Sequence, residues 1–164
     1  MKLGFLSDIH LDSNDQFPVK ENIAKYCNDN KINYLLIAGD IYSNYYNITA
    51  FLSYMERHVD TKVAFVPGNH DLYKTTPSSI KLITSDKIYE ELSNLPECVV
   101  NNPVELGDWI ILGETGWYDY SFRAKGFKDD ELNRQRYKGF AWADKKHFKW
   151  GELSNKEVHD SFFH

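Results

Sequence analysis

The chain has 164 residues, of which 42% are hydrophobic and 15% aromatic, and its formal net charge is -5 at pH 7. A chain of this length and composition buries one hydrophobic core and is too short for two ordinary domains. The net negative charge argues against a protein that binds long stretches of nucleic acid through their phosphates. Small phosphate compounds and phosphorylated proteins remain possible ligands.

The cysteines and the first residues of the chain argue against further classes of protein. The two cysteines, Cys27 and Cys98, form no CxxC spacing, so neither a disulfide framework nor a zinc knuckle is indicated. The start of the chain lacks the basic residues and long apolar core of a signal peptide, and no apolar run approaches membrane-spanning length. We therefore expect a cytoplasmic protein without a membrane partner.

The first part of the chain predicts three strands separated by two helices. Short apolar or β-branched runs favour strands at residues 2–6, 34–38 and 62–66. Apolar residues at helical spacing favour helices at 19–30 and around 48–55. Right-handed crossovers make the strands of such a β-α-β-α-β unit parallel. The predicted fold class is therefore α/β.

The rest of the chain gives weaker patterns. We expect a helix around residues 79–92, strand at 99–100 and 104–112 with a hairpin turn at Gly107-Asp108, and irregular structure with short helical pieces from 117 to 150. Ser154 followed three residues later by Glu157 is a capping-box pattern, which predicts a final helix over 156–163.

Three short polar motifs follow the three predicted strands: DIH at residues 8–10, GD at 39–40 and GNHD at 68–71. They are spaced about 30 residues apart, which is the length of one β-α-β unit. Because parallel strands end at the same edge of a sheet, the motifs should meet where open α/β sheets place their ligands. Carboxylates, imidazole and an amide oxygen together suit divalent metals such as Mn, Fe or Zn.

The ordered trio of motifs resembles the calcineurin-like metallophosphoesterase superfamily, whose pattern runs DxH, then GD, then GNHD or GNHE. The resemblance implies that Asp8 and His10 hold a first metal ion, that Asp40 bridges two ions and that Asn69 ligates the second. It also implies a hydrolase of phosphomonoesters or phosphodiesters. Two ions about 3.5 to 4 Å apart would polarise the phosphate and supply a bridging hydroxide for in-line attack.

The same motif suggests the acid–base residues. His70 would protonate the leaving oxygen or stabilise charge, and Asp71 is the candidate to orient its imidazole. Alternatives remain open for single residues: Asp8 and Asp40 could cap the helices that follow them, and His70 could be a structural hydrogen-bond donor.

Other polar and aromatic residues are assigned to structure or solvent. We expect the loop residues Asp12, Asn14 and Asp15 to be solvated, and the aromatic residues of 117–122 to pack in the core more than to line a cleft. The cations of 134–149 form a mixed-charge, solvated face more readily than a phosphate site. These cations are Arg134, Arg136, Lys145, Lys146 and Lys149.

The chain departs from the family pattern in its second half. Family members supply a lone histidine and then a GHxH string, whereas the late histidines here are His147, His159 and His164, the last two expected at the surface. We therefore expect one domain, residues 1–164, that represents the N-terminal part of the family's αββα sandwich. An uncovered sheet face would need a second copy or a missing C-terminal half.

The alternative function is a catalytically weak or inactive metal-binding or interaction module. A Ser/Thr protein phosphatase fits poorly, because that branch resembles GDxxDRG followed by GNHE, and this chain has GDIYSN followed by GNHD. Nothing in the sequence selects a particular phosphate ester.

Overall fold

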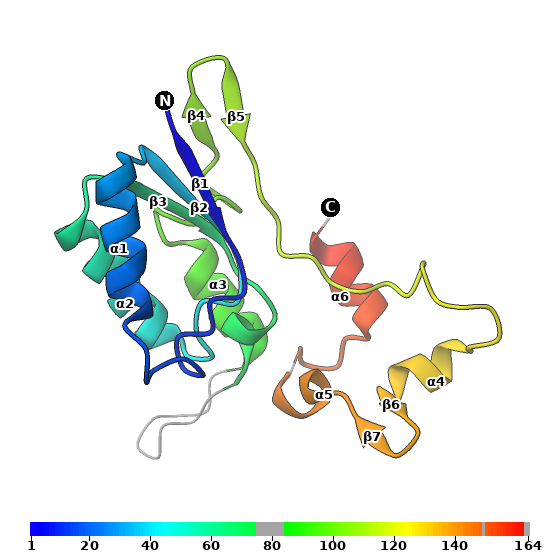
Figure 1. Cartoon of the computed structure of the whole chain (residues 1–164). Coiled ribbons are helices and arrows are strands. Elements are labelled where there is room, and N and C mark those ends of the chain that lie inside the picture. The colour runs from blue at the N-terminus through cyan, green and yellow to red at the C-terminus, as the bar shows by residue number, and fades with distance from the viewer. Residues whose placement is uncertain (75–83, 149, 163–164) are drawn as a thin grey trace.

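A three-stranded parallel sheet forms the centre of the structure, a computed structural model that describes residues 1–74, 84–148 and 150–162. Strands β1 (Leu3–Leu6), β2 (Tyr34–Ala38) and β3 (Lys62–Val66) pair in this order. Helices α1 (Val19–Asn30) and α2 (Tyr45–His58) connect them and lie on the same side of the sheet (Figure 1). The predicted β-α-β-α-β order and α/β class are confirmed.

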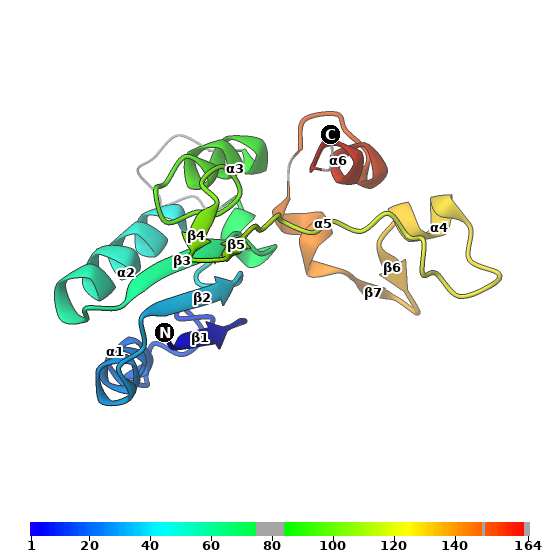
Figure 2. The ribbon, with the colours of Figure 1, turned by 90° about the horizontal axis from the view of Figure 1, so that it is seen from above.

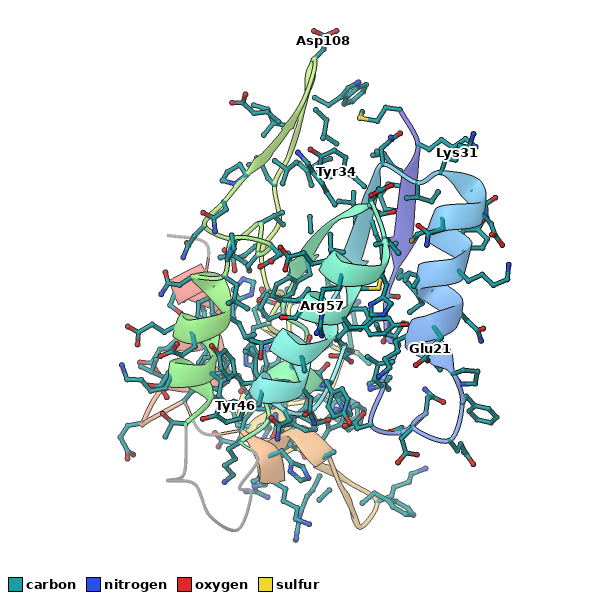
Figure 3. All side chains as sticks on the ribbon, turned by 90° about the vertical axis from the view of Figure 1, so that its left-hand side faces the viewer. Glu21, Lys31, Tyr34, Tyr46, Arg57 and Asp108 are labelled. Atoms are coloured by element: carbon teal, nitrogen blue, oxygen red, sulfur yellow. The ribbon has the colours of Figure 1, made fainter. Side chains whose placement is uncertain are left out.

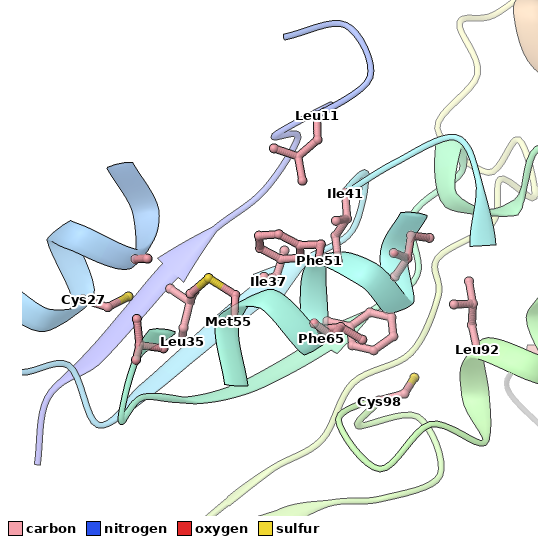
Figure 4. Close-up of a cluster of buried hydrophobic side chains, with 14 of the residues drawn as sticks. Leu11, Cys27, Leu35, Ile37, Ile41, Phe51, Met55, Phe65, Leu92 and Cys98 are labelled. Carbon is pink, nitrogen blue, oxygen red and sulfur yellow. The ribbon is translucent and has the colours of Figure 1, made fainter. Parts of the chain in front are cut away.

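The helix-covered face of the sheet carries the hydrophobic core. Alternate residues of β2 and β3 point to this face, as the two-residue period of a strand requires. Leu35, Ile37 and Phe65 are at most 3% exposed, and burial of each of these side chains contributes about 1.5–3 kcal/mol to folding. The core side chains from the sheet and the two helices include Leu35, Ile37, Phe65, Cys27, Phe51 and Met55 (Figure 4).

The opposite face of the sheet is only partly covered. Phe5 on β1 is 70% exposed, and an apolar hollow of about 540 Å³ lies between it, Val66 and Leu112. The predicted hairpin is present as β4 (Val104–Leu106) and β5 (Trp109–Ile111), and it projects past the sheet with Asp108 at its tip (Figure 3). The hairpin therefore leaves part of an apolar sheet face in contact with water.

The later helices match the sequence in part. Helix α3 (Ser85–Ser93) overlaps the helix predicted for 79–92, of which residues 79–83 lie outside the described residues. Helix α6 (Asn155–Phe162) begins as predicted, because the Ser154 N–H donates to the Glu157 carboxylate over 2.8 Å; residue 163 lies outside the description. None of the described helices is long and apolar enough to cross a membrane.

The segment between the hairpin and α6 contains the short helical pieces that the sequence predicts, together with two short strands that it does not predict. They are helix α4 (Asp129–Asn133), the paired strands β6 (Arg136–Tyr137) and β7 (Phe140–Ala141), and helix α5 (Ala143–His147). Seen from above, α4, β6 and β7 lie away from the sheet, and α5 lies between them and it (Figure 2). Helix α5 is therefore the part of this segment that can reach the edge of the sheet.

Candidate metal centre

The loops that follow β1 and β2 run side by side at the carboxyl edge of the sheet. The Asp8 N–H donates to the Gly39 carbonyl over 3.1 Å, and the His10 N–H donates to the Asp40 carbonyl over 3.0 Å. Asp8, His10 and Asp40 have positive φ angles of 54°, 40° and 56°. Residues other than glycine adopt this conformation at a cost in free energy, so the surrounding loops impose it.

Three side chains converge at this edge. His10, Asp40 and His70 each offer one ligand atom, and these atoms all lie within 4.8 Å of one another. Nε2 of His10 is 3.6 Å from Oδ2 of Asp40, and the ring centroids of His10 and His70 are 4.5 Å apart. The His10 imidazole and the Asp40 carboxylate are ligands that fit a borderline divalent metal ion, and the His70 imidazole lies within reach of the same position.

The other two predicted ligands lie beside this group of three. Asp8 is exposed at the end of β1 and is not among its members. Asn69 directs its side-chain nitrogen to Asp144 over 3.0 Å, so its carbonyl oxygen is the atom left to ligate a metal. The structure thus brings His10 and Asp40 together with His70, which the sequence predicts as the acid.

The helix-capping alternative for the two aspartates does not hold. Pro18 precedes α1, and the side chain of Asn44 caps α2 by accepting a hydrogen bond from the Tyr46 N–H. Asp8 and Asp40 lie several residues before these positions. Their side chains therefore do not serve the helix termini.

Two glycines let the second and third loops approach closely. A Cβ atom on Gly68 would lie 2.3 Å from Oδ1 of Asp40, and a Cβ on Gly39 would lie 2.6 Å from the Gly68 Cα. Gly39 also has a φ of +76°. Glycine is thus required at both positions, because a side chain at either one would collide with the other loop. Gly68 also sets the space available to the Asp40 carboxylate.

Replacing Gly68 with alanine should displace the Asp40 carboxylate. We expect kcat/KM of any metal-dependent reaction at this site to fall by about 100-fold, because a misplacement of about 1 Å at a reacting centre has an effect of this size. The matched control is Gly116→Ala, since a Cβ on Gly116 meets nothing within 4 Å. Equal activity of the two variants would contradict the proposed role of the contact.

Asp71 connects the loops through their backbones. Its Oδ2 accepts hydrogen bonds from the N–H groups of Asp40 and Gly68, both over 2.8 Å, and its Oδ1 accepts from Ile41 and Tyr42 over 2.8 and 2.9 Å. The side chain is fully buried. Burial raises the pKa of Asp71 to about 7, against the opposing effect of these backbone groups.

This geometry corrects one prediction. The sequence suggests that Asp71 orients the His70 imidazole, but both carboxylate oxygens are directed at the backbone of two loops. Asp71 is therefore a residue that holds the metal-site loops together.

The family assignment follows from comparison with known proteins. A family model described as calcineurin-like phosphoesterase matches residues 1–159. The chain belongs to the calcineurin-like phosphoesterase family. No curated protein and no solved structure matches it.

Asp144 is a residue of this calcineurin-like phosphoesterase that sequence reasoning missed. It lies on α5, is 5% exposed, and accepts hydrogen bonds from the Asn69 side chain over 3.0 Å and from the Tyr73 hydroxyl over 2.6 Å. Burial and the neighbouring Asp144 raise the pKa of the Tyr73 hydroxyl, which keeps it a donor. Asp144 thereby fixes which end of the Asn69 amide faces the metal centre.

Removing this acceptor should weaken metal binding. We expect Asp144→Leu to lower the affinity for Mn by about 10- to 100-fold, the usual effect of losing a group that orients a metal ligand. Asp144→Asn keeps an oxygen acceptor and should retain most of the wild-type affinity for Mn. Calorimetric titration with Mn measures both; the same loss in the two variants would contradict an orienting role.

Two loop residues near the candidate metal centre, Asp12 and Asn14, form hydrogen bonds within the protein. Asp12 accepts a hydrogen bond from the Ser43 N–H over 3.2 Å, and Asn14 donates to the Ile9 and His10 carbonyls over 3.0 and 3.1 Å. These two side chains therefore brace the loop that carries His10. The prediction that they are simply solvated is wrong.

The late histidines have separate environments. The His147 ring stacks on Tyr73 at 4.8 Å, and burial lowers the pKa of His147. His159, expected at the surface, is half-buried and forms a 2.8 Å hydrogen bond with the Trp117 carbonyl. His164 lies outside the described residues.

Proposed function

We propose that the chain is a metal-dependent phosphoesterase that hydrolyses phosphomonoester or phosphodiester bonds with two divalent ions, Mn, Fe or Zn. The observation that supports this most directly is the convergence of His10, Asp40 and His70 at the strand ends of a calcineurin-like phosphoesterase. The cytoplasm is its expected location.

We assign the residues at this edge of the sheet two roles, metal ligand and proton donor. His10, Asp40 and the carbonyl oxygen of Asn69 would hold the ions, with Asp8 joining from the exposed end of β1. When bound, such ions polarise phosphoryl oxygens and lower the pKa of coordinated water. Asp40 is suited to be the shared ligand because its backbone and side chain contact all three loops.

His70 is the residue that we propose to serve the leaving group. Its backbone N–H donates to Oδ1 of Asp40 over 2.9 Å, which fixes the residue, while its ring remains half-buried next to His10. Imidazole is the side chain best suited to transfer a proton near neutral pH. We assign it the protonation of the leaving oxygen.

Metal-stripped protein should hydrolyse p-nitrophenyl esters only when Mn is returned. The assay compares p-nitrophenyl phosphate with bis-p-nitrophenyl phosphate, and the preferred ester separates a monoesterase from a diesterase. His70→Ala should lower kcat by about 100- to 10,000-fold, the usual contribution of general acid–base catalysis. Its effect on KM should be small.

The results of this assay distinguish a phosphoesterase from an inactive metal-binding module. Mn-dependent release of p-nitrophenol that is lost in His70→Ala supports the proposal. Mn binding without turnover of either ester would favour the inactive metal-binding module instead.

A further inference from the structure

The segment from Trp117 to Phe148 is positively charged in an otherwise acidic protein. It holds eight lysine or arginine residues and five acidic ones, whereas the whole chain holds 19 and 24. The expected core packing of its aromatic residues holds for Trp117, which is 7% exposed, and is wrong for Phe122, which is fully exposed. Exposed aromatic rings among cations are typical of surfaces on which nucleic acid bases stack.

A cavity of about 870 Å³ lies in this segment. Its apolar walls come from Tyr118, Tyr120, Phe127, Leu132 and Trp142. This volume is in the range of pockets that take small molecules. Trp142 is 64% and Phe127 is 39% exposed, so a planar apolar group that covers these rings gains free energy by removing them from water.

The tyrosine wall of this cavity is held in place by hydrogen bonds. The Tyr118 hydroxyl accepts one from the side chain of Gln135, and the Tyr120 hydroxyl accepts one from the side chain of Asn155 on α6. The two tyrosine ring centroids are 5.5 Å apart. A ligand therefore meets a surface that loses little side-chain entropy on binding.

Cations line a second hollow that shares residues with the aromatic cavity. Arg134, Arg136 and Trp142 line both spaces, and Lys145 and Lys146 complete the second one, which has a volume of about 580 Å³. Within the part of the chain that the structure describes, the lining of the second hollow contains four cations and no carboxylate. Guanidinium and ammonium groups in this arrangement favour a phosphate.

Helix α5 links this hollow to the candidate metal centre. Lys145 and Lys146 follow Asp144 directly, and Asp144 binds the side chain of Asn69. Figure 2 shows α5 between the sheet and α4. A phosphate held by these lysines therefore lies on the element that contacts the metal site.

We propose that the aromatic cavity binds the base of a nucleotide, that the cations of the second hollow bind its phosphate, and that the phosphoester substrate is a nucleotide, free or at the end of a single strand. That the nucleotide is hydrolysed rests on the proposed phosphoesterase function, whereas nucleotide binding does not depend on it. A sugar phosphate would leave the aromatic rings in water. Glu131, the acidic residue of the cavity lining, supplies an acceptor for an exocyclic amino group of the base.

The test is binding to the full chain in the presence of a chelator, so that no turnover is needed. Adenosine 5′-monophosphate, adenosine, ribose 5-phosphate and a short 5′-phosphorylated oligodeoxyadenosine are titrated, and binding is followed by tryptophan fluorescence and by calorimetry. We expect ribose 5-phosphate to bind roughly 5- to 150-fold more weakly than the nucleotide, the range that stacking of one base gives. Adenosine should also bind more weakly, because it lacks the phosphate.

Two variants locate the site. Trp142→Ala should weaken nucleotide binding by roughly 5- to 150-fold. Lys146→Gln should weaken nucleotide binding without changing adenosine binding, because Lys146 lines the second hollow and not the aromatic cavity. The matched control is Phe140→Ala, because Phe140 is 81% exposed and lies outside both linings. Circular dichroism checks that each variant is folded, and Lys146→Gln tests the site if Trp142→Ala does not fold.

Each outcome has a consequence. Tighter binding of the oligodeoxyadenosine than of the mononucleotide would indicate a single-strand end, and the reverse order a free nucleotide. Equal binding of nucleotide and ribose 5-phosphate, or an equal effect of Phe140→Ala and Trp142→Ala, would overturn the inference. Mn-dependent hydrolysis of p-nitrophenyl esters with no nucleotide binding would overturn it and leave the proposed phosphoesterase function intact.

Discussion

Asp40→Asn should abolish metal-dependent hydrolysis of p-nitrophenyl esters, with a fall in kcat/KM of more than about 100-fold. The loss of a group that merely orients a ligand has an effect of about 10- to 100-fold, and the loss of a shared ligand should exceed it. Asparagine keeps the shape of the side chain and an oxygen that can accept the 2.9 Å hydrogen bond from the His70 N–H. The variant therefore removes the charge and leaves the loop contact.

The measurement combines kinetics with metal content. Mn bound per chain is determined in parallel with hydrolysis, and urea unfolding shows whether the variant is folded. The matched control is Asp60→Asn, an exposed aspartate just before β3, at the opposite edge of the sheet. Full Mn binding and activity in Asp40→Asn would rule out Asp40 as a ligand; equal losses in both variants would point to a general effect of charge.

The fold could be predicted because it depends on local patterns. The strands at 34–38 and 62–66 and the helix at 19–30 have the predicted bounds, since each is a short apolar run or an amphipathic repeat that ends at a polar residue, a glycine or a proline. The parallel order then follows from the handedness of the crossovers. The meeting of His10 and Asp40 is a consequence of this topology.

The roles of neighbouring residues within one motif could not be predicted in this way. His70 and Asp71 both lie in the short 3₁₀ turn η1 (His70–Leu72), where successive side chains point about 120° apart. His70 therefore faces the metal edge while Asp71 points into the protein. Adjacency in the sequence suggests a hydrogen bond between them that this turn geometry does not favour.

Asp144 was missed for a different reason. It contacts Asn69 across 75 residues of sequence, from a segment whose aromatic and charged residues follow neither a helical nor a strand period. Next to Lys145 and Lys146 it resembles part of a solvated charged face. A contact of this range is set by the packing of α5 against the sheet edge, and single-sequence patterns do not contain it.

Asp71→Asn should destabilise the protein by about 2–6 kcal/mol, although it replaces none of the predicted metal ligands. The carboxylate accepts four backbone N–H groups, two on each oxygen. An asparagine nitrogen would face two of these donors, and each buried N–H without an acceptor costs about 1–3 kcal/mol. The effect should therefore appear first in stability.

Urea unfolding at pH 8, above the pKa of about 7 that burial gives Asp71, measures this change with the carboxylate ionised. Asp108→Asn at the exposed hairpin tip is the matched control and should change stability by no more than about 0.5 kcal/mol. If Asp71 instead served mainly to orient His70, Asp71→Asn would keep wild-type stability and lose kcat. A large loss of stability, with Mn affinity falling because the two loops separate, is the result that the four hydrogen bonds require.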